Sequence, residues 1–235
     1  MPGPVALVGA GEFLSSMAEF DAGLLLATGR SRPRVAILPT ASYPGGEDVF
    51  NRRAAMGIAY FGGLGAEVEP VLVRDRAEAD DAGAAQAVGE ADLIYLSGGK
   101  PAYLLGVLGD SAVGRAIISA HERGAVVAGS SAGAVVLGGY AFDFRVRSVP
   151  WPLRWRPGLG CAPGAAVLPR YDAWPEPICA LVALQAPHGS VILGIDGETA
   201  LVGRDGTWQV HGRSRVTVWS GRRRDRYRAG EIVRL

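Results

Sequence analysis

Residues 124–137 read Gly-Ala-Val-Val-Ala-Gly-Ser-Ser-Ala-Gly-Ala-Val-Val-Leu, and they are the strongest indication of the fold. The apolar run 124–128 is typical of a buried strand, and the small apolar residues 134–137 are typical of the first turns of a packed helix. Between them, residues 129–133 fit the G-x-S-x-G pattern, which places a serine at a sharp strand-to-helix turn beside free backbone N–H groups. We therefore predict a nucleophile elbow at Ser131. A glycine- and serine-rich turn without chemistry is the alternative.

Strand-like and helix-like segments alternate along the chain as far as about residue 198. The expected strands are Val5–Val8, Val35–Leu38, Ala66–Val73 and Asp92–Leu96, and the expected helices run from Ser15 or Ser16 to Gly29, from Glu47 to Tyr60 and from Ala116 to Arg123. This alternation predicts an α/β fold with a mostly parallel sheet flanked by helices on both faces. Ligands bind such sheets at the carboxyl ends of the strands. The glycine-rich turns after Leu96 and Ala128 should therefore share one edge.

The last part of the chain has a different pattern, in which short runs of alternating apolar and polar residues are separated by turn residues. This pattern predicts that residues 200–235 form an antiparallel β-hairpin tail. The expected strands are Ala200–Gly203, Trp208–Val210, Val216–Trp219 and Ile232–Leu235, with Arg222, Arg223 and Arg224 in a solvated turn. No repeat or linker interrupts the sequence, so we expect residues 1–235 to form a single domain.

Composition limits the function classes further. The chain has 235 residues, of which 49% are hydrophobic and 20% charged, which is enough for one large core. Its formal net charge of +1 argues against nucleic acid or an anionic membrane as a partner. No run of about 18 apolar residues is present, so no membrane span is expected.

The cysteines and the N-terminus point to a cellular compartment. Cys161 and Cys179 lack a C-x-x-C spacing and a neighbouring histidine pair, which favours free thiols over a disulfide or a zinc site. The N-terminus has no basic region of the kind that opens a signal peptide. We expect a cytoplasmic protein with no metal and no cofactor.

The motifs together resemble those of peptidase family S51, which includes cyanophycinase and aspartyl dipeptidase E. That family lies within the class I glutamine-amidotransferase-like superfamily. The resemblance rests on Ile37-Leu38-Pro39-Thr40-Ala41-Ser42, Leu96-Ser97-Gly98-Gly99, residues 128–134, Gly158-Leu159-Gly160, Gly194-Ile195-Asp196 and Thr199-Ala200-Leu201. It implies a Ser-His-acid hydrolase that cleaves peptides at aspartyl residues. Ser131 would be the nucleophile, and the backbone N–H groups of Gly99 and Ala132 would form the oxyanion hole.

The sequence departs from the family pattern where the rest of the triad is expected. The strand that leads to the family's catalytic histidine ends here in Pro169-Arg170-Tyr171, so Arg170 occupies the histidine position. An arginine guanidinium stays protonated at neutral pH and cannot accept the serine proton. The acidic position is shifted as well, because Glu198 lies one residue later than the family's glutamate. Glu198 therefore remains only a weak candidate for the acid.

Other side chains could replace the missing base. His188 lies in a turn before the strand that leads to Asp196, which suggests the far edge of the sheet and makes it a weak candidate. Lys100 is the only lysine, and it adjoins Gly99, so it could form a Ser-Lys dyad or bind an anionic ligand. We expect Lys100, Arg170 and Tyr171 to contribute to ligand binding.

Residues 143–157 interleave arginines with aromatic residues in a long connection. Such a loop suits an acidic or aromatic ligand, and a contact in a homodimer is the alternative. Three hypotheses follow for a small-molecule or peptide ligand of acidic character. The leading one is an S51-like serine hydrolase in which peptide cleavage is slow or absent. The others are a non-catalytic binding or regulatory protein on the same fold, and an α/β-hydrolase-type esterase that uses His188 or His211.

Overall fold

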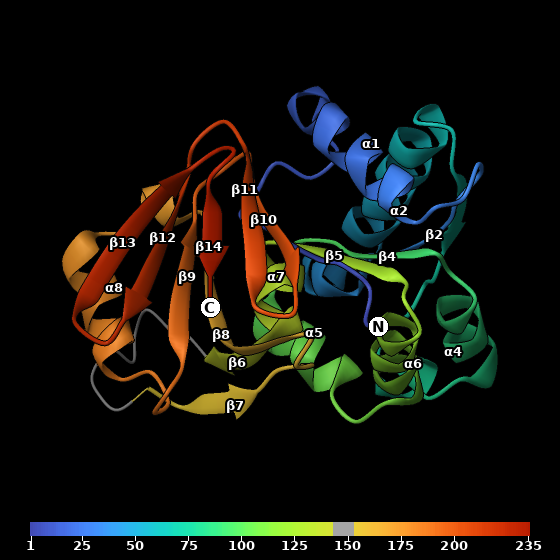
Figure 1. Ribbon diagram of the computed structural model, residues 1–235. Helices are drawn as coiled ribbons and strands as arrows, with labels where there is room; N and C mark the ends of the chain where they lie inside the picture. Colours follow the sequence, from blue (N-terminus) through green and yellow to red (C-terminus); the bar gives the residue numbers. More distant parts are fainter. Residues whose placement is uncertain (143–152) are drawn as a thin grey trace.

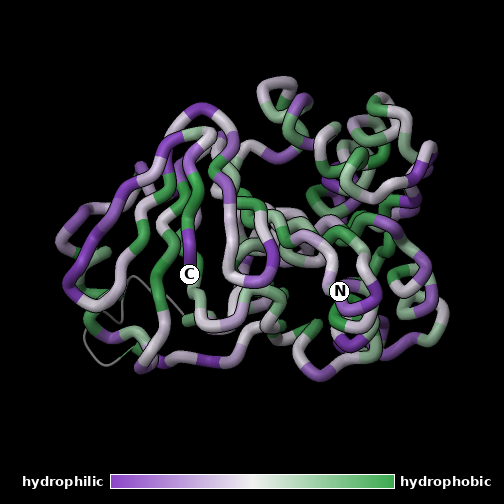
Figure 2. The backbone as a smooth tube through the Cα atoms, viewed as in Figure 1, coloured by the Kyte–Doolittle hydropathy of each residue, from purple (hydrophilic) through white to green (hydrophobic). Residues whose placement is uncertain are grey.

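Two β-sheets with helices packed on them make up the computed structural model, which describes residues 1–142 and 153–235 (Figure 1). An eight-stranded sheet carries most of the helices, and a six-stranded sheet lies beside it with a nine-residue helix on its outer face. The class is mixed α/β, as the sequence predicts. Strands are the most hydrophobic parts of the backbone trace, and loops and the outer strand β13 are hydrophilic (Figure 2).

The eight-stranded sheet has the order β14-β11-β10-β1-β5-β4-β2-β3. Its strands β3, β2, β4, β5 and β1 run parallel, and β10, β11 and β14 are added antiparallel. The strand bounds are β1 Val5–Val8, β2 Arg34–Leu38, β3 Glu67–Pro70, β4 Leu93–Leu96, β5 Val126–Ser130, β10 Thr199–Arg204, β11 Thr207–Gly212 and β14 Ile232–Arg234.

The six-stranded sheet has the order β13-β12-β9-β8-β6-β7. Strands β6, β8 and β9 are parallel, whereas β7, β12 and β13 pair antiparallel. The bounds are β6 Gly138–Phe142, β7 Trp155–Pro157, β8 Ala162–Pro169, β9 Val191–Ile195, β12 Arg215–Ser220 and β13 Arg223–Arg228.

Helices cover both faces of the eight-stranded sheet (Figure 1). On one face α1 and α2 pack against alternate strand residues such as Ile37 and Tyr95, and on the other face α4 to α7 pack against residues such as Leu38 and Leu96. Helix α8 covers the six-stranded sheet around Ile192. The helices are α1 Ala18–Ala27, α2 Glu47–Gly63, α3 Arg76–Ala79, α4 Ala82–Gly89, α5 Pro101–Leu108, α6 Ala112–Glu122, α7 Ala132–Leu137 and α8 Glu176–Leu184, with short 3-10 turns η1 Ser15–Met17, η2 Thr40–Gly45 and η4 Tyr171–Ala173.

Some expected boundaries need correction. The strand expected at Ala66–Val73 is only Glu67–Pro70, although Val71 N still donates to Ile37 O of β2 at 2.9 Å. Of the arginines expected in a turn, Arg222 lies in the turn, whereas Arg223 and Arg224 begin strand β13, Arg223–Arg228. Arginines are tolerated there because an edge strand keeps its charged side chains in water. The expected C-terminal antiparallel hairpins are present as β10–β11 and β12–β13, and the two hairpins are divided between the two sheets.

The structure also bears on the cysteines, on the connection 143–157 and on membrane-spanning helices. Cys161 and Cys179 are both unpaired and buried. Of the aromatic and arginine-rich connection 143–157, residues 143–152 lie outside the described residues, and Trp155–Pro157 form β7. Within the described chain, no single helix is long and apolar enough to cross a membrane, although α5 and α6 together, bent by 89°, have a suitable length and composition.

Candidate functional site

Ser131 lies at the turn between β5 and α7. Its backbone has φ 50° and ψ −104°, outside the usual regions for a residue with a side chain. The turn is held by hydrogen bonds from Ser131 N to Val8 O (2.9 Å) and from Val135 N to Ser131 O (3.1 Å). Ser130 and Ala132 are buried, whereas Ser131 is partly exposed. The serine side chain is therefore accessible at a backbone position that is otherwise enclosed.

The two glycines of the G-x-S-x-G run are required by close packing. A Cβ atom added to Gly129 would lie 2.5 Å from the carbonyl carbon of Gly133. A Cβ atom added to Gly133 would lie 2.2 Å from Leu96 O, on the neighbouring strand β4. Both distances are far shorter than a van der Waals contact, so any larger residue would push α7 away from the sheet. The motif thus fixes how Ser131 is presented.

The loop after β4 approaches this turn from the adjacent strand. A Cβ atom added to Gly98 would lie 3.4 Å from Ser131 Cβ, so the loop passes directly beside the serine. Gly99 has φ +155°, and a Cβ atom there would lie 2.1 Å from Ala41 O. Lys100 N donates to the same carbonyl at 2.8 Å, and the Lys100 side chain is exposed. The segment 98–100 is thereby fixed between η2 and Ser131.

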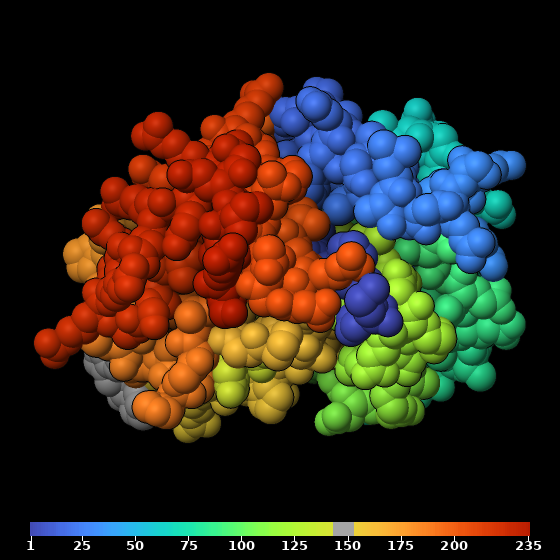
Figure 3. All heavy atoms as spheres, viewed as in Figure 1, coloured from blue at the N-terminus to red at the C-terminus, as the bar shows by residue number. Residues whose placement is uncertain are grey.

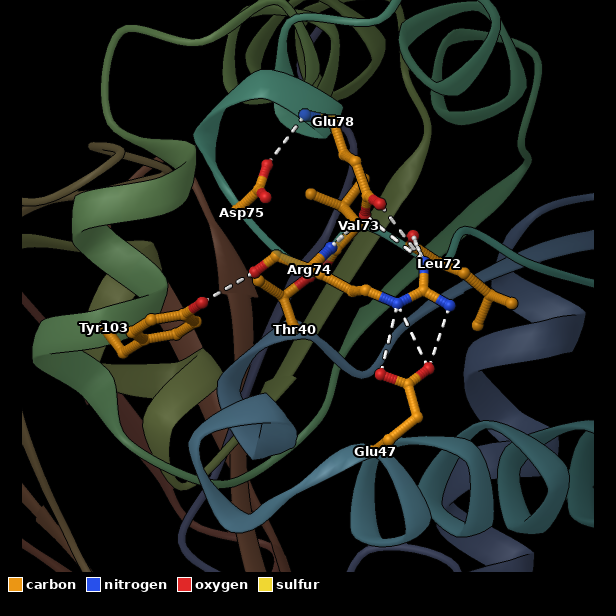
Figure 4. Close-up of polar contacts among 8 residues, drawn as sticks. All are labelled: Thr40, Glu47, Leu72, Val73, Arg74, Asp75, Glu78 and Tyr103. Atoms are coloured by element: carbon orange, nitrogen blue, oxygen red, sulfur yellow. Dashed lines mark hydrogen bonds and ion pairs between the residues drawn. The ribbon is translucent and has the colours of Figure 1, made fainter.

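A polar network beneath this loop holds η2 in place (Figure 4). Arg74 pairs with Glu47 of α2 at 3.0 Å and with Glu78 of α3 at 3.3 Å. Its carbonyl accepts a hydrogen bond from the Tyr103 hydroxyl of α5 at 2.9 Å, and Thr40 Oγ1 donates to Val73 O at 2.8 Å. These contacts join the segment before Ala41 to the helix that follows Lys100. They therefore stabilise the loop on which Gly99 rests.

Glu12 is a site residue that the sequence analysis missed. It follows β1, and its side chain is only 8% exposed. One carboxylate oxygen pairs with Arg53 Nη1 at 2.6 Å, and the other accepts the Gly98 N–H at 2.6 Å. Burial raises the pKa of Glu12, and this effect is opposed by Arg53, by the Gly98 N–H and by a hydrogen bond with Ser130. The only signal in the sequence is a lone acidic residue in the turn after the first strand.

Glu12 and Ser131 both lie close to Gly98. A Cβ atom on Gly98 would lie 3.2 Å from Glu12 Oε1 and 3.4 Å from Ser131 Cβ. Both oxygens of Glu12 are already engaged by Gly98 and Arg53. The carboxylate is therefore placed to hold the loop beside Ser131 rather than to accept the serine proton.

The turn between β9 and β10 brings two acidic residues to the same edge. Glu198 N donates to Ala10 O at 3.0 Å, and a Cβ atom on Gly11 would lie 3.0 Å from Glu198 Cγ. Glu198 thus lies against the turn that carries Glu12, and it pairs with Arg213 at 3.5 Å. Asp196 is 2% exposed, and the Ser214 hydroxyl donates to its Oδ2 at 2.7 Å. Of the two carboxylates, Asp196 is buried and Glu198 is partly open to solvent.

The end of β8 places Arg170 and Tyr171 on the six-stranded sheet. Arg170 has a left-handed backbone, with φ 50° and ψ 45°, and it is exposed. The Tyr171 ring covers Gly194, where a Cβ atom would lie 2.2 Å from the ring, and its hydroxyl accepts a hydrogen bond from Trp219 Nε1 at 2.8 Å. Burial is the main cause that raises the pKa of Tyr171. Asp172 Oδ1 accepts the Gly197 N–H at 2.8 Å, which ties this turn to the β9–β10 turn.

These turns lie at a common edge. Strands β1, β4 and β5 are parallel and in register, with Val8 opposite Ser130 and Leu96 opposite Gly129. A Cβ atom on Gly9, directly after β1, would lie 2.1 Å from Asp196 O, so the carboxyl ends of β1 and β9 touch. Ser131, Glu12, Gly98, Asp196 and Glu198 therefore gather along one edge of the two sheets.

The three histidines lie apart from Ser131. His188 is exposed in the turn between α8 and β9, at the opposite end of β9 from Asp196. His211 is on β11, and its ring lies 5.7 Å from that of Phe20, with burial lowering its pKa. His121 is near the end of α6, and burial lowers its pKa as well. In the described part of the chain, the hydrogen bonds of Ser131 are those of its backbone with Val8 and Val135, and none joins it to a histidine.

Residues 5–210 match the family model described as Peptidase family S51. The chain belongs to peptidase family S51. Cyanophycinases from Trichormus variabilis and from a Nostoc species are each 30% identical to it over 203 residues, covering 81% of this chain. The alignment covers 64% of the length of those cyanophycinases, so each has a considerable part without a counterpart here.

Two solved structures share the fold. A peptidase from an acI-B1 actinobacterium aligns with a TM-score of 0.88 and 30% identity, covering 100% of this chain and 98% of that one. A putative peptidase E from Listeria monocytogenes EGD-e aligns with a TM-score of 0.61 and 20% identity, covering 91% of this chain and 100% of that one. At 20% identity the second match speaks for the fold alone. The fold is the class I glutamine-amidotransferase-like fold of S51 peptidases, which confirms the family resemblance seen in the sequence.

Proposed function

We propose that this S51 protein binds an acidic peptide or small molecule at the Ser131 edge and hydrolyses aspartyl peptides slowly or not at all. The observation that supports this most is the combination of an accessible Ser131 at a strand-to-helix turn with an exposed Arg170 at the end of β8. In the family pattern the β8 position belongs to the catalytic histidine. Here an arginine supplies positive charge where a base is expected.

The proposal assigns the binding of a substrate carbonyl to Ser131 and to two neighbouring backbone N–H groups. Ser131 acts as the nucleophile of an elbow, and the backbone N–H groups of Ala132 and Gly99 form the oxyanion hole. Glu12 holds the Gly98 peptide beside Ser131 through its 2.6 Å hydrogen bond, which keeps the Gly99 peptide in position. Glu198 would be the weak acidic partner at the same edge.

Proton transfer is the missing part. A serine hydroxyl needs a neighbouring base, and loss of general-base catalysis typically costs about 10²–10⁴-fold in rate. Lys100 is exposed and so lacks the burial that a lysine base requires. His188 lies beyond the opposite end of β9. We therefore assign Arg170, together with Lys100 and Tyr171, to ligand binding.

The ligand class follows from charge and from the relatives. Two of the relatives are named cyanophycinase, and we propose that this chain shares with its family the recognition of aspartyl groups. Arg170 and Lys100 favour a carboxylate at this edge. A purely binding or regulatory role is the second candidate, favoured by the same exposed Arg170. Family membership favours both over an unrelated esterase. We also infer a cytoplasmic location, which the unpaired Cys161 and Cys179 support.

The test is to supply the missing base. The Arg170→His variant is compared with wild type, with Arg170→Gln as a matched variant that removes the charge without adding a base, and with Ser131→Ala. Each is treated with a fluorophosphonate probe and given a panel of aspartyl dipeptides. We expect slow labelling in wild type and in Arg170→Gln, and labelling at least about 10-fold faster in Arg170→His. Rapid labelling or turnover by wild type that Ser131→Ala abolishes would contradict the proposal.

A further inference from the structure

The C-terminal strands carry a concentration of positive charge that the Ser131 site does not account for. Residues 213–228 contain seven arginines and one acidic residue, Asp225. All of them lie beyond the residues 5–210 that the family model matches. Strand β13, which carries most of them, is at the outer edge of the six-stranded sheet and is exposed on the molecular surface (Figure 3). It is hydrophilic along its length (Figure 2).

Alternation along β13 sorts these arginines by face. Successive side chains of a strand point to opposite faces, so Arg224, Arg226 and Arg228 share one face. Their cross-strand partners on β12 are Trp219, Thr217 and Arg215 respectively. Arg215 is therefore directly opposite Arg228, and Arg226 is the next residue on that face. Two like charges directly opposite each other destabilise a β-ladder unless an anion lies between them.

The two ends of this face differ in how well their charge is neutralised. At the inner end, where β13 begins, Glu176 of α8 pairs with Arg224 and lies 3.5 Å from Arg226. The Arg224 guanidinium also lies over the Trp219 ring at 5.5 Å. At the outer end, where Arg215 is opposite Arg228, Arg215 is 3.5 Å from the buried Asp196. Among the described residues, no carboxylate pairs with the exposed Arg228 side chain. Four guanidinium groups thus share two carboxylates, and the excess positive charge lies at the outer end.

That outer end is at the same edge as Ser131. Strand β12 begins at Arg215 and pairs antiparallel with β9, so Arg215 lies beside the carboxyl end of β9, and Asp196 N donates to Arg215 O at 3.2 Å. The carboxyl end of β9 touches Gly9, whose strand neighbours the one that leads to Ser131. Three strand spacings separate Ser131 from Arg215, which is roughly 15 Å. An extended peptide spans this distance with about five residues.

We propose that Arg215, Arg226 and Arg228, the arginine row, bind the carboxylates of an aspartate-rich peptide whose reacting or recognised bond lies at Ser131. The proposal rests on the proposed function and extends it to a subsite about five residues away. Side chains two residues apart in an extended peptide are separated by ~6.7 Å, which is also the spacing of Arg226 and Arg228 along β13. Alternate carboxylates of the peptide therefore match the spacing of the arginine row. The net charge of +1 gives no general attraction for polyanions, so binding depends on the local match between the arginine row and alternate peptide carboxylates.

The test measures peptide binding separately from hydrolysis. A fluorescein-labelled octa-aspartate peptide is titrated by fluorescence anisotropy with the Ser131→Ala protein, so that the peptide stays intact. The same background carries Arg228→Gln, the double change Arg226→Gln/Arg228→Gln, and the matched control Arg32→Gln. Arg32 is exposed, and no ion pair of its side chain is found in the described chain. Octa-asparagine and a single-stranded dT8 oligonucleotide serve as neutral and non-peptide probes.

At low salt we expect the double variant to weaken octa-aspartate binding roughly 10-fold, Arg228→Gln about 2- to 5-fold and Arg32→Gln less than about 1.5-fold. Octa-asparagine should bind more weakly and be insensitive to all three changes. Equal losses in the double variant and in Arg32→Gln would overturn the proposal, and so would equal binding of octa-asparagine. Tight dT8 binding that the double variant weakens equally would assign the row to nucleic acid. Failure of the proposed function would instead appear as Ser131 labelling in wild type, which these titrations do not depend on.

Discussion

Asp21 provides a quantitative test of how the helices on the α1 face are held to the sheet. It lies on α1 and is 1% exposed, with Oδ2 accepting a hydrogen bond from the Tyr60 hydroxyl of α2 at 2.8 Å. No partner for Oδ1 is found in the described part of the chain. Burial raises the pKa of Asp21 from 3.8 to about 7, and the Tyr60 hydrogen bond opposes this only in part. The folded protein therefore favours the protonated form of this side chain.

The sign of the pH effect follows from proton linkage. Between pH 3.8 and about 7 the folded state binds more protons at Asp21 than the unfolded state does, so the free energy of unfolding falls as pH rises. The stabilisation is complete below pH 3.8 and is lost as pH rises through about 7. At about 1.4 kcal/mol per pKa unit, the whole effect is roughly 4 kcal/mol, of which about 3 kcal/mol falls between pH 5 and pH 8.

The perturbation is Asp21→Asn, which removes the titration and keeps an acceptor for the Tyr60 hydroxyl. Urea unfolding of both proteins is followed by circular dichroism at pH 5, 6, 7 and 8. The new amide group costs stability equally at every pH, so the informative quantity is the change in the difference between the two proteins. We expect wild type to lose about 3 kcal/mol relative to Asp21→Asn from pH 5 to pH 8. The exposed change Glu19→Gln on the same helix is the matched control. Parallel pH curves for wild type and Asp21→Asn would refute the reasoning.

Two further changes test the site. Gly99→Ala should destabilise the fold by about 2–4 kcal/mol and abolish any labelling of Ser131, because the new Cβ atom would lie 2.1 Å from Ala41 O. The control is Gly62→Ala, where a Cβ atom would meet nothing within 4 Å. In the same urea unfolding assay this control should be neutral or stabilising. Glu12→Gln should cost about 1–3 kcal/mol by breaking the pair with Arg53, and Glu12→Ala should additionally slow probe labelling at Ser131 by freeing the Gly98 N–H. Unchanged labelling in Glu12→Ala would show that the carboxylate does not position the loop.

Local pattern was enough to predict the turn at Ser131. The apolar strand, the glycine pair and the small apolar helix are contiguous in sequence. Gly129 is explained by a contact within the turn, whereas Gly133 is explained by its approach to Leu96 on β4. The same holds for β1, β2 and β4, since each is a mainly apolar run followed by a turn. Boundaries shifted where an edge strand ended early, at Pro70.

The missed features depend on contacts between distant parts of the chain. Glu12 meets Gly98 across 86 residues of sequence, and nothing local marks the turn after β1 as the partner of the turn after β4. The division of the C-terminal strands between two sheets was equally invisible, because a hairpin pattern specifies pairing between neighbours and not the sheet that receives them. Strand β13 was missed because arginines are uncommon in strand interiors and are tolerated at an edge.

The path of the chain through the two sheets has a consequence for how the protein can vary. After β9 in the six-stranded sheet, the chain enters the eight-stranded sheet for β10 and β11, returns for β12 and β13, and comes back for β14. Neither sheet is a continuous piece of sequence, so recombination cannot exchange one sheet while leaving the other intact. The hairpin that carries the arginine row, β12 and β13, is by contrast one continuous stretch of sequence. Substitution within that hairpin, or exchange of the hairpin alone, can therefore change the charge at this edge without altering the strands that lead to Ser131.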